Sequence, residues 1–253
     1  MSTDILLNIL NTTIMEYLIK VFAFILLSTG LFANADKPTE GSTLQVIAPS
    51  GLNLRALPSM TASPLLTMPH GAEVTLLEFE ESGELTRVDW IDGKWIKVEY
   101  NGVEGWAFDG FLTILNVPSH DLELTKEYLD LGRSLEMWAR HNFYATEIDT
   151  ILTDGSQTVK YKLENNQFLR KSDTGVTTVT ELHLEGVKVM EAYQLINAMI
   201  TDDRHKTQFS ENAIFIEKGG VINHVKINIS PEITIRKTYD NQVKVLIEEY
   251  HGC

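Results

Sequence analysis

Three polar residues at alternate positions, Glu181, His183 and Glu185, are the strongest candidates for chemistry in this chain. Alternate residues of a β-strand lie on one face, so these side chains would share a surface. A histidine between two carboxylates could bind a metal ion or act as a general base. The alternation with Leu182 and Leu184 is also typical of a half-exposed strand, and we favour a solvent-facing polar strip.

The other nucleophiles and bases form no catalytic pattern. The single cysteine, Cys253, is the last residue, whereas a thiol peptidase needs cysteine at the start of a helix. The seven histidines include no H-x-x-x-H or H-E-x-x-H pair, and G-x-S-x-G, S-x-x-K and phosphate-binding glycine loops are absent from the sequence. We therefore expect no catalytic residue, no metal site and no cofactor. The 35 Asp and Glu residues leave open a carboxylate pair for glycoside cleavage.

The elements that would hold Glu181 and His183 lie in the C-terminal half. Apolar residues at helical spacing predict one helix over residues 122–138 and a second over residues 187–200. Alternating apolar runs predict strands at residues 161–163, 168–170, 176–184, 213–217, 221–229, 233–239 and 243–250. This order favours an α+β domain over residues 120–253, with an antiparallel sheet and two helices.

Residues 43–115 have a different pattern, in which short alternating runs are separated by Gly, Pro and Asn-Gly. This pattern favours a small all-β barrel. The ordered steps Asn53-Leu54-Arg55, Pro58, Gly71, Trp95, Asn101-Gly102 and Gly105-Trp106 resemble those of bacterial SH3-like domains. The resemblance implies an SH3-like barrel that tethers extracytoplasmic proteins to cell-wall or surface ligands. It also implies that Trp106 packs the barrel shut.

The same resemblance implies that the ligand is a cell-wall peptide, a glycan or a protein partner. Outward-facing aromatic rings could stack on a sugar or a peptide, and a guanidinium could hold a carboxylate. We therefore predict that Trp90, Arg55 and Asn53 are binding residues. Trp90 lies in an acidic insertion, residues 80–92, which is longer than the usual connection in the family. Trp90 could instead close its own loop, and Arg55 could be paired locally.

The N-terminus has the pattern of a secretory signal. Lys20 is followed by the apolar run 21–27 and by the small-residue site Ala33-Asn34-Ala35. Because the run is shorter than the ~20 residues of a spanning helix, we expect residues 1–35 to be removed, with an uncleaved anchor as the alternative. Translation could start at Met15. Residues 36–42 would then be a linker, and residues 116–119 would be a hinge between the two domains.

The charge of the chain restricts its partners. It has 253 residues, with 21 Lys and Arg against 35 Asp and Glu, and a net charge of −14. Binding to phosphates needs clustered cations, so we expect no nucleic-acid partner. We expect a periplasmic or extracellular protein of the cell envelope that acts in non-catalytic recognition or scaffolding. The alternatives are a cell-wall hydrolase with an unrecognised site in the C-terminal domain, and an inhibitor or immunity-like protein that binds a basic partner.

Overall fold

The computed structural model describes residues 38–79, 84–88, 90–118, 130–164, 167–200 and 202–252. The chain from Lys37 to Cys253 forms one compact unit. The predicted signal, residues 1–35, lies outside the described residues, as does the first part of the helix predicted from residue 122. Within the described part of the chain, no helix has the length and apolar character needed to cross a membrane.

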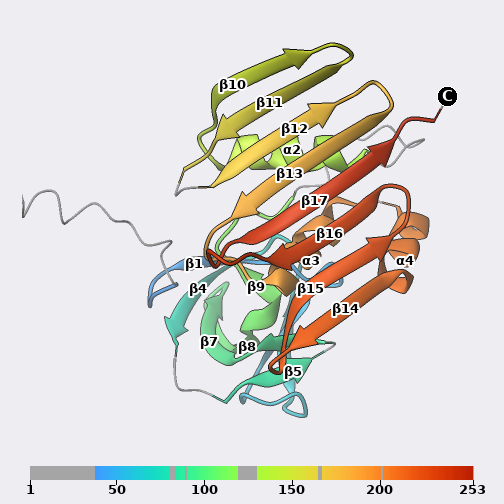
Figure 1. Ribbon diagram of the computed structural model, residues 1–253. Helices are drawn as coiled ribbons and strands as arrows, with labels where there is room; N and C mark the ends of the chain where they lie inside the picture. Colours follow the sequence, from blue (N-terminus) through green and yellow to red (C-terminus); the bar gives the residue numbers. More distant parts are fainter. Residues whose placement is uncertain are drawn as a thin grey trace, which may run out of the picture. The chain divides into compact units, whose positions relative to one another are not determined.

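The N-terminal part of this unit is a seven-stranded antiparallel sheet (Figure 1). In spatial order its strands are β3 (Pro64–Met68), β2 (Leu52–Arg55), β8 (Val103–Phe108), β7 (Trp95–Tyr100), β4 (Glu73–Glu78), β1 (Thr43–Val46) and β9 (Leu112–Thr113). A short 3-10 helix, η1 (Asp109–Phe111), precedes β9. The all-β character expected of these residues is confirmed, and the seven-stranded sheet has its own apolar core.

Gly105 on β8 shows why this core accepts only certain residues. A Cβ atom at this position would lie 2.7 Å from Cγ of Leu54 and 2.9 Å from the carbonyl oxygen of Arg55. Only glycine therefore lets β8 approach β2 so closely.

The insertion at residues 80–92 contributes a separate two-stranded sheet, formed by β5 (Thr86–Val88) and β6 (Ile91–Gly93). Arg87 on β5 donates to Asp92 at 2.7 and 2.9 Å within the hairpin. It also donates to Glu217 Oε2 at 3.0 Å and to the carbonyl oxygen of Gly220 at 2.7 Å. The hairpin is therefore attached to the C-terminal half of the chain.

The C-terminal half forms an eight-stranded sheet, which is antiparallel as expected but has one strand more than the seven predicted. In spatial order its strands are β10 (Thr146–Thr153), β11 (Ser156–Lys162), β12 (Phe168–Asp173), β13 (Thr177–Leu184), β17 (Val243–Tyr250), β16 (Glu232–Lys237), β15 (Val221–Asn228) and β14 (Ala213–Lys218). β10 was not predicted, because all eight of its residues are exposed and no one-sided apolar pattern marks it.

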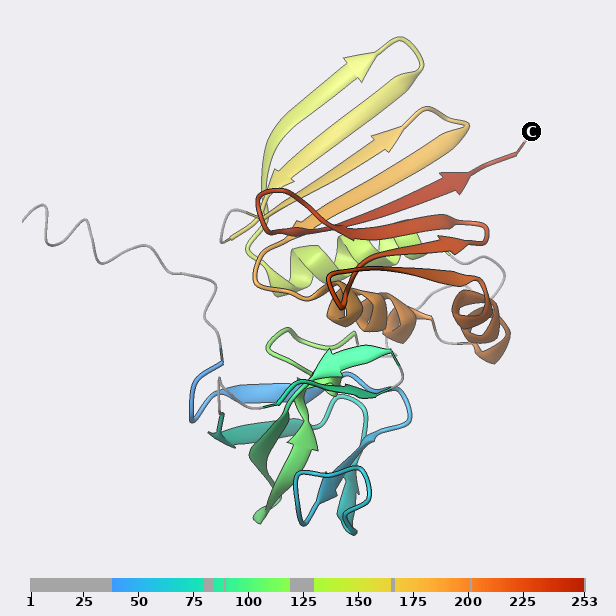
Figure 2. The ribbon, with the colours of Figure 1, turned by 60° about the horizontal axis from the view of Figure 1, so that its bottom comes forward.

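Three described helices accompany this sheet, where the sequence predicted two: α2 (Leu131–Asn142), α3 (Val189–Met199) and α4 (Asp203–Glu211). α2 and α3 lie on the same face of the sheet (Figure 2). The unexpected helix, α4, begins after Asp202, whose side chain accepts from the His205 N–H at 3.0 Å. Phe209 is its one fully buried residue and stacks on Tyr193 of α3, so α4 has almost no apolar stripe for the sequence to reveal.

The two halves share a core. Ile47, Ile91 and Phe108 belong to the same buried cluster as the apolar residues of α2, α3 and the eight-stranded sheet. Gln194 of α3 donates to the carbonyl oxygen of Gly110 at 2.7 Å. The connecting segment is bonded as well, because the indole N–H of Trp138 donates to the carbonyl oxygen of Asn116 at 2.8 Å.

Candidate binding site

The structure brings Glu181 and His183 together on β13, where His183 Nε2 lies 2.8 Å from Glu181 Oε1. Glu181 is only 5 % exposed and also accepts from Lys244 on β17 and Arg170 on β12. The hydrogen bond from His183 and the two cations lower the pKa of Glu181 to about 2. The His183 ring stacks on Phe168, with 3.9 Å between ring centroids.

These contacts change the interpretation of the polar strip. The prediction that Glu181 faces solvent was wrong, because its cross-strand neighbours Arg170 and Leu246 and the nearby Lys244 enclose it. Glu185 lies beyond the end of β13. The described residues contain no group of three His, Cys, Asp or Glu side chains able to hold a metal ion. A carboxylate with so low a pKa is a weak base at neutral pH, so Glu181 serves as an ion-pair centre.

A second group of residues lies on the outward face of the N-terminal sheet. Gly105 and Ala107 of β8 are buried, so Trp106 between them points away from the core of that sheet. The register places Trp106 opposite Arg55 on β2 and Lys97 on β7. The indole N–H of Trp106 has no hydrogen-bond partner among the residues that the structure describes.

The predicted residues Asn53 and Arg55 share this face, because Leu52 and Leu54 alternate with them and are buried. Arg55 donates to the carbonyl oxygen of Ala62 at 2.6 Å. Asn53 Oδ1 accepts from the Thr67 hydroxyl at 2.8 Å. We call the surface formed by Asn53, Arg55, Lys97 and Trp106 the Trp106 face.

The rim of the Trp106 face carries ion pairs. Lys97 lies 3.1 Å from Glu104 and 3.2 Å from Glu78, and hydrogen bonds to these two carboxylates raise the pKa of Lys97. Both carboxylates are exposed, so the pairs order the rim and add little stability. The Arg55 guanidinium uses one N–H group on Ala62 and retains others that could hold a ligand carboxylate.

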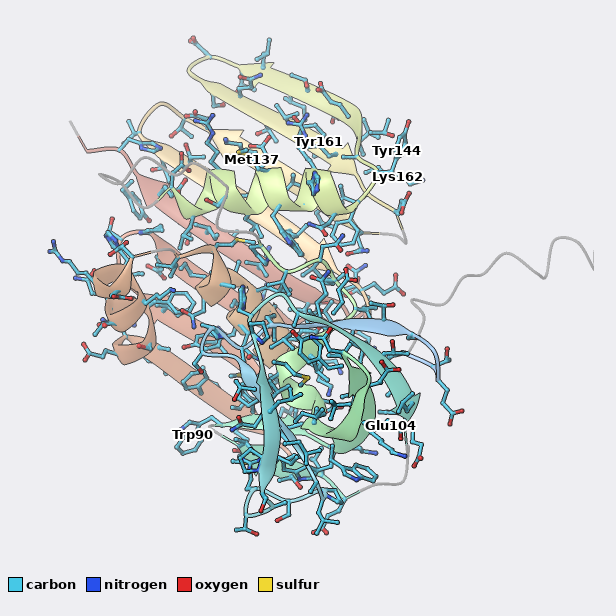
Figure 3. All side chains as sticks on the ribbon, turned by 180° about the vertical axis from the view of Figure 1, so that it is seen from behind. Trp90, Glu104, Met137, Tyr144, Tyr161 and Lys162 are labelled. Carbon is cyan, nitrogen blue, oxygen red and sulfur yellow. The ribbon has the colours of Figure 1, made fainter. Side chains whose placement is uncertain are left out.

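Trp90 lies elsewhere, in the turn between β5 and β6, where its φ is 66° and its side chain is 63 % exposed. Figure 3 shows Trp90 well separated from Glu104, which is two residues from Trp106 on β8. Among the described residues, no hydrogen bond, ion pair or ring contact joins Trp90 to Asn53 or Arg55. The structure therefore brings together two of the three predicted binding residues.

Sequence reasoning missed Trp106 as a surface residue because the family resemblance implied a core position. The signal that could have found it is the alternation Gly105-Trp106-Ala107, in which two small residues face the core and the large ring faces outward. Trp95, on the neighbouring strand, does contact apolar core: it packs against the shared cluster and meets Phe108 edge-on at 5.9 Å.

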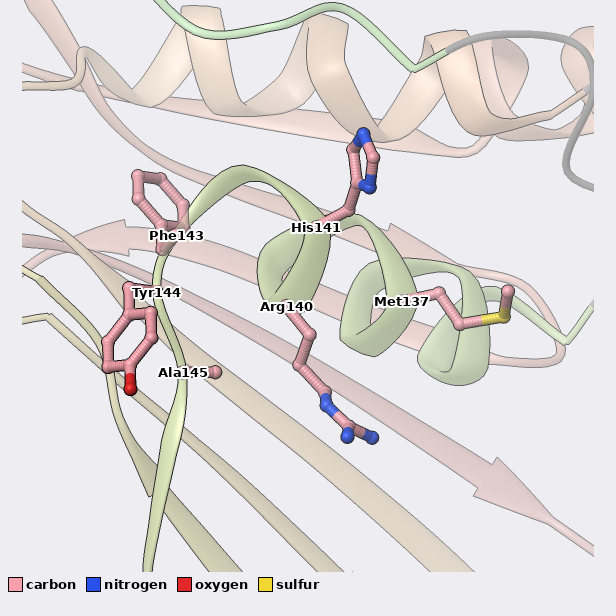
Figure 4. Close-up of a pocket in the computed structure, with 6 residues that line it drawn as sticks. All are labelled: Met137, Arg140, His141, Phe143, Tyr144 and Ala145. Carbon is pink, nitrogen blue, oxygen red and sulfur yellow. The ribbon is translucent and has the colours of Figure 1, made fainter.

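A shallow surface pocket of about 750 Å³ lies at the C-terminal end of α2 (Figure 4). Its lining residues are Met137, Arg140, His141, Phe143, Tyr144 and Ala145. The Arg140 guanidinium lies 4.9 Å from the ring centroid of Tyr161 on β11. The lining has no carboxylate, serine or cysteine that could pair with His141, so it lacks the partners of an acid–base or nucleophilic site.

The comparisons with known proteins concern the N-terminal half. Residues 50–113 match the family model of the bacterial SH3 domain. No curated protein and no solved structure matches the chain. The matched segment runs from just before β2 to β9 and includes the whole Trp106 face, whereas the eight-stranded sheet lies outside it. Residues 50–113 are therefore a bacterial SH3 domain, as the Asn53-Leu54-Arg55 and Gly105-Trp106 steps indicated.

Proposed function

We propose that this chain is an exported protein of the cell envelope whose bacterial SH3 domain binds a cell-wall peptide or glycan without cleaving it. The domain family supports a binding role. The observation that carries the proposal is the Trp106 face, where a tryptophan ring lies between Arg55 and Lys97 in register. The pattern of a signal at residues 1–35 supports export.

The chemistry of the Trp106 face suits such ligands. An indole ring offers a flat apolar surface for a sugar ring or a peptide, and its N–H can donate to a ligand oxygen. The free N–H groups of Arg55 can pair with a carboxylate, which wall peptides provide. The exposed apolar residues Leu57 and Met60, in the loop that Arg55 fastens, could extend the contact.

The direct test is sedimentation of the Lys37–Cys253 unit with purified insoluble cell wall. We expect Trp106→Ala to weaken binding about tenfold, because aromatic anchors dominate binding energy, and Arg55→Ala to weaken it less. Trp90→Ala is the matched control, since it removes an equally large and more exposed ring from the same domain. Thermal melting of each variant separates lost binding from lost folding.

Three outcomes would contradict the proposal. Loss of binding in Trp90→Ala but not in Trp106→Ala would move the site to the β5–β6 turn. Absence of binding by the unaltered protein would make the domain a docking module for another protein. Release of soluble fragments from the wall would make the chain a hydrolase.

A further inference from the structure

The face of the eight-stranded sheet that carries no helix has an unusual row of residues. Strand register places one residue from each of six adjacent strands side by side: Lys162, Phe168, His183, Lys244, Arg236 and His224. We call this set the basic row. It contains no carboxylate, although the chain has a net charge of −14.

The basic row lies on the surface away from α2 and α3. Five of its members alternate along their strands with fully buried residues of the shared core, Leu169, Leu182, Val245, Ile235 and Val225, and Lys162 is followed by the buried Leu163. Since successive residues of a strand point to opposite faces, the row points away from that core. Figure 1 views the sheet from this side, with α2 and α3 behind the strands.

Some cations on this face are already neutralised. Lys244 pairs with Glu181, as does Arg170 from the neighbouring row. Lys226 lies 2.7 Å from Glu232, and Lys160 lies 3.7 Å from Asp149.

The two exposed cations of the basic row are different. Arg236 and Lys162 are exposed and have no carboxylate partner among the described residues. Arg236 lies directly opposite Lys244, whose own charge is paired with Glu181. The pKa of His224 is lowered by its burial and then by Arg236 and Lys226, so this ring is held neutral beside them. Arg236 and Lys162 are therefore left to hold an anion from outside the chain.

We propose that the basic row binds an extended polyanion through repeated carboxylate or phosphate groups. Five strand spacings separate Lys162 from His224, which corresponds to roughly 24 Å and exceeds the size of a single anion. The same face already binds a carboxylate, because Glu181 is held by His183, Lys244 and Arg170. This inference is independent of the function proposed for the bacterial SH3 domain.

Two polymers distinguish the sources of negative charge: fluorescently labelled poly-glutamate and inorganic polyphosphate. We expect the Lys37–Cys253 unit to bind one or both, and the affinity to fall as salt is raised, because ions screen exposed charges. The double variant Arg236→Glu, Lys162→Glu should bind about tenfold more weakly, since it reverses both unpaired charges. Urea unfolding shows whether the double glutamate variant is folded. If it is not folded, the milder double variant Arg236→Gln, Lys162→Gln replaces it in the binding measurement.

Lys237→Glu is the matched control. Lys237 is the next residue of β16 after Arg236, is exposed, and lies on the opposite face. Lys237→Glu makes the same charge change per site as Arg236→Glu. Because Lys237 faces away from the basic row, we expect this variant to change the affinity by less than about twofold. Binding of neither polymer overturns the proposal, and so does equal weakening by Lys237→Glu and the single variant Arg236→Glu. Preference for single-stranded DNA over both polymers would show that bases, and not repeated anionic groups alone, are recognised, which would overturn the proposal and assign a nucleic acid to this face.

Discussion

Glu181 and Glu191 are the same residue type with pKa values displaced in opposite directions. Hydrogen bonding by His183, with Lys244 and Arg170 nearby, lowers the pKa of Glu181 to about 2. Removal from water is the main influence on Glu191, and it raises that pKa. Neighbouring donors and cations therefore decide whether an enclosed carboxylate stabilises the fold as an anion.

Replacing Glu181 with glutamine should destabilise the protein by about 3 kcal/mol at pH 7, because the shifted pKa measures the lost interaction with its cations. The pKa of Glu181 is lower in the folded state than the ordinary 4.5. Its stabilisation is therefore complete above pH 4.5 and disappears as the pH falls through about 2. Urea unfolding of the unaltered protein and of Glu181→Gln should therefore show their difference in free energy of unfolding shrinking as the pH falls from 4.5 to about 2.

Glu185→Gln is the control for this effect. Glu185 is four residues further along the chain than Glu181 and forms no ion pair with the described residues. We expect its replacement to change the free energy of unfolding by less than about 0.5 kcal/mol. Equal effects of the two substitutions would contradict the ion-pair explanation.

The strands and helices that could be predicted from the sequence are those that bury one face. Residues 176–184, 221–229 and 243–250 alternate clearly, and they form β13, β15 and β17. β10 has no buried residue, and α4 has only Phe209, so neither leaves a one-sided pattern.

The candidate site was predictable in part for a related reason. Alternation in β2 indicated that Asn53 and Arg55 face outward. The family resemblance assigned Trp106 to the core, where the alternation of β8 contradicts it. The pairing of β2 with β8, which places Trp106 opposite Arg55, depends on long-range register that a single sequence does not reveal.

The contact between α3 and β9 supplies a prediction with the opposite pH dependence. Thr113 donates to Glu191 Oε1 at 2.6 Å, and Glu191 also accepts from the Lys188 N–H at the start of α3. Because the pKa of Glu191 is raised in the folded state, ionisation costs stability as the pH rises above the ordinary 4.5. Glu191→Gln should therefore gain stability relative to the unaltered protein between about pH 4 and pH 7.

Urea unfolding across this range measures the Glu191→Gln effect, with Glu181→Gln as an internal comparison of opposite sign. At the lowest pH, the difference in free energy of unfolding between the two proteins reports only on the hydrogen bonds of residue 191, because a protonated glutamate and a glutamine are both neutral there. A constant difference between Glu191→Gln and the unaltered protein at every pH would show that the carboxylate is not held away from water.

Because they share a core, the bacterial SH3 domain and the eight-stranded sheet depend on each other for their stability. Ile47, Ile91 and Phe108 pack into the cluster of the C-terminal half, and Gln194 reaches the backbone at Gly110. Arg87 adds an attachment to Glu217 and Gly220. Unfolding of one half would expose apolar surface of the other.

We therefore expect Lys37–Cys253 to unfold in a single transition. Tryptophan fluorescence and far-ultraviolet circular dichroism should give coincident midpoints in urea, because cooperative units lose all signals together. Calorimetry provides the second measurement, with one peak expected. Two separated transitions would contradict the coupling and show that the bacterial SH3 domain folds independently.

The exposed margin of the eight-stranded sheet has a consequence for how this protein must be handled and kept in solution. In the part of the chain that the structure describes, β10 pairs only with β11, so its outer backbone groups can accept a strand from another molecule. Its apolar residues Ile148 and Leu152 are 58 % and 73 % exposed, which favours such additions. Glu147 and Asp149 flank a register shift in this strand and would repel a second copy. Concentrated samples should therefore begin to polymerise through this edge strand when Glu147 and Asp149 are protonated at low pH or replaced by neutral residues.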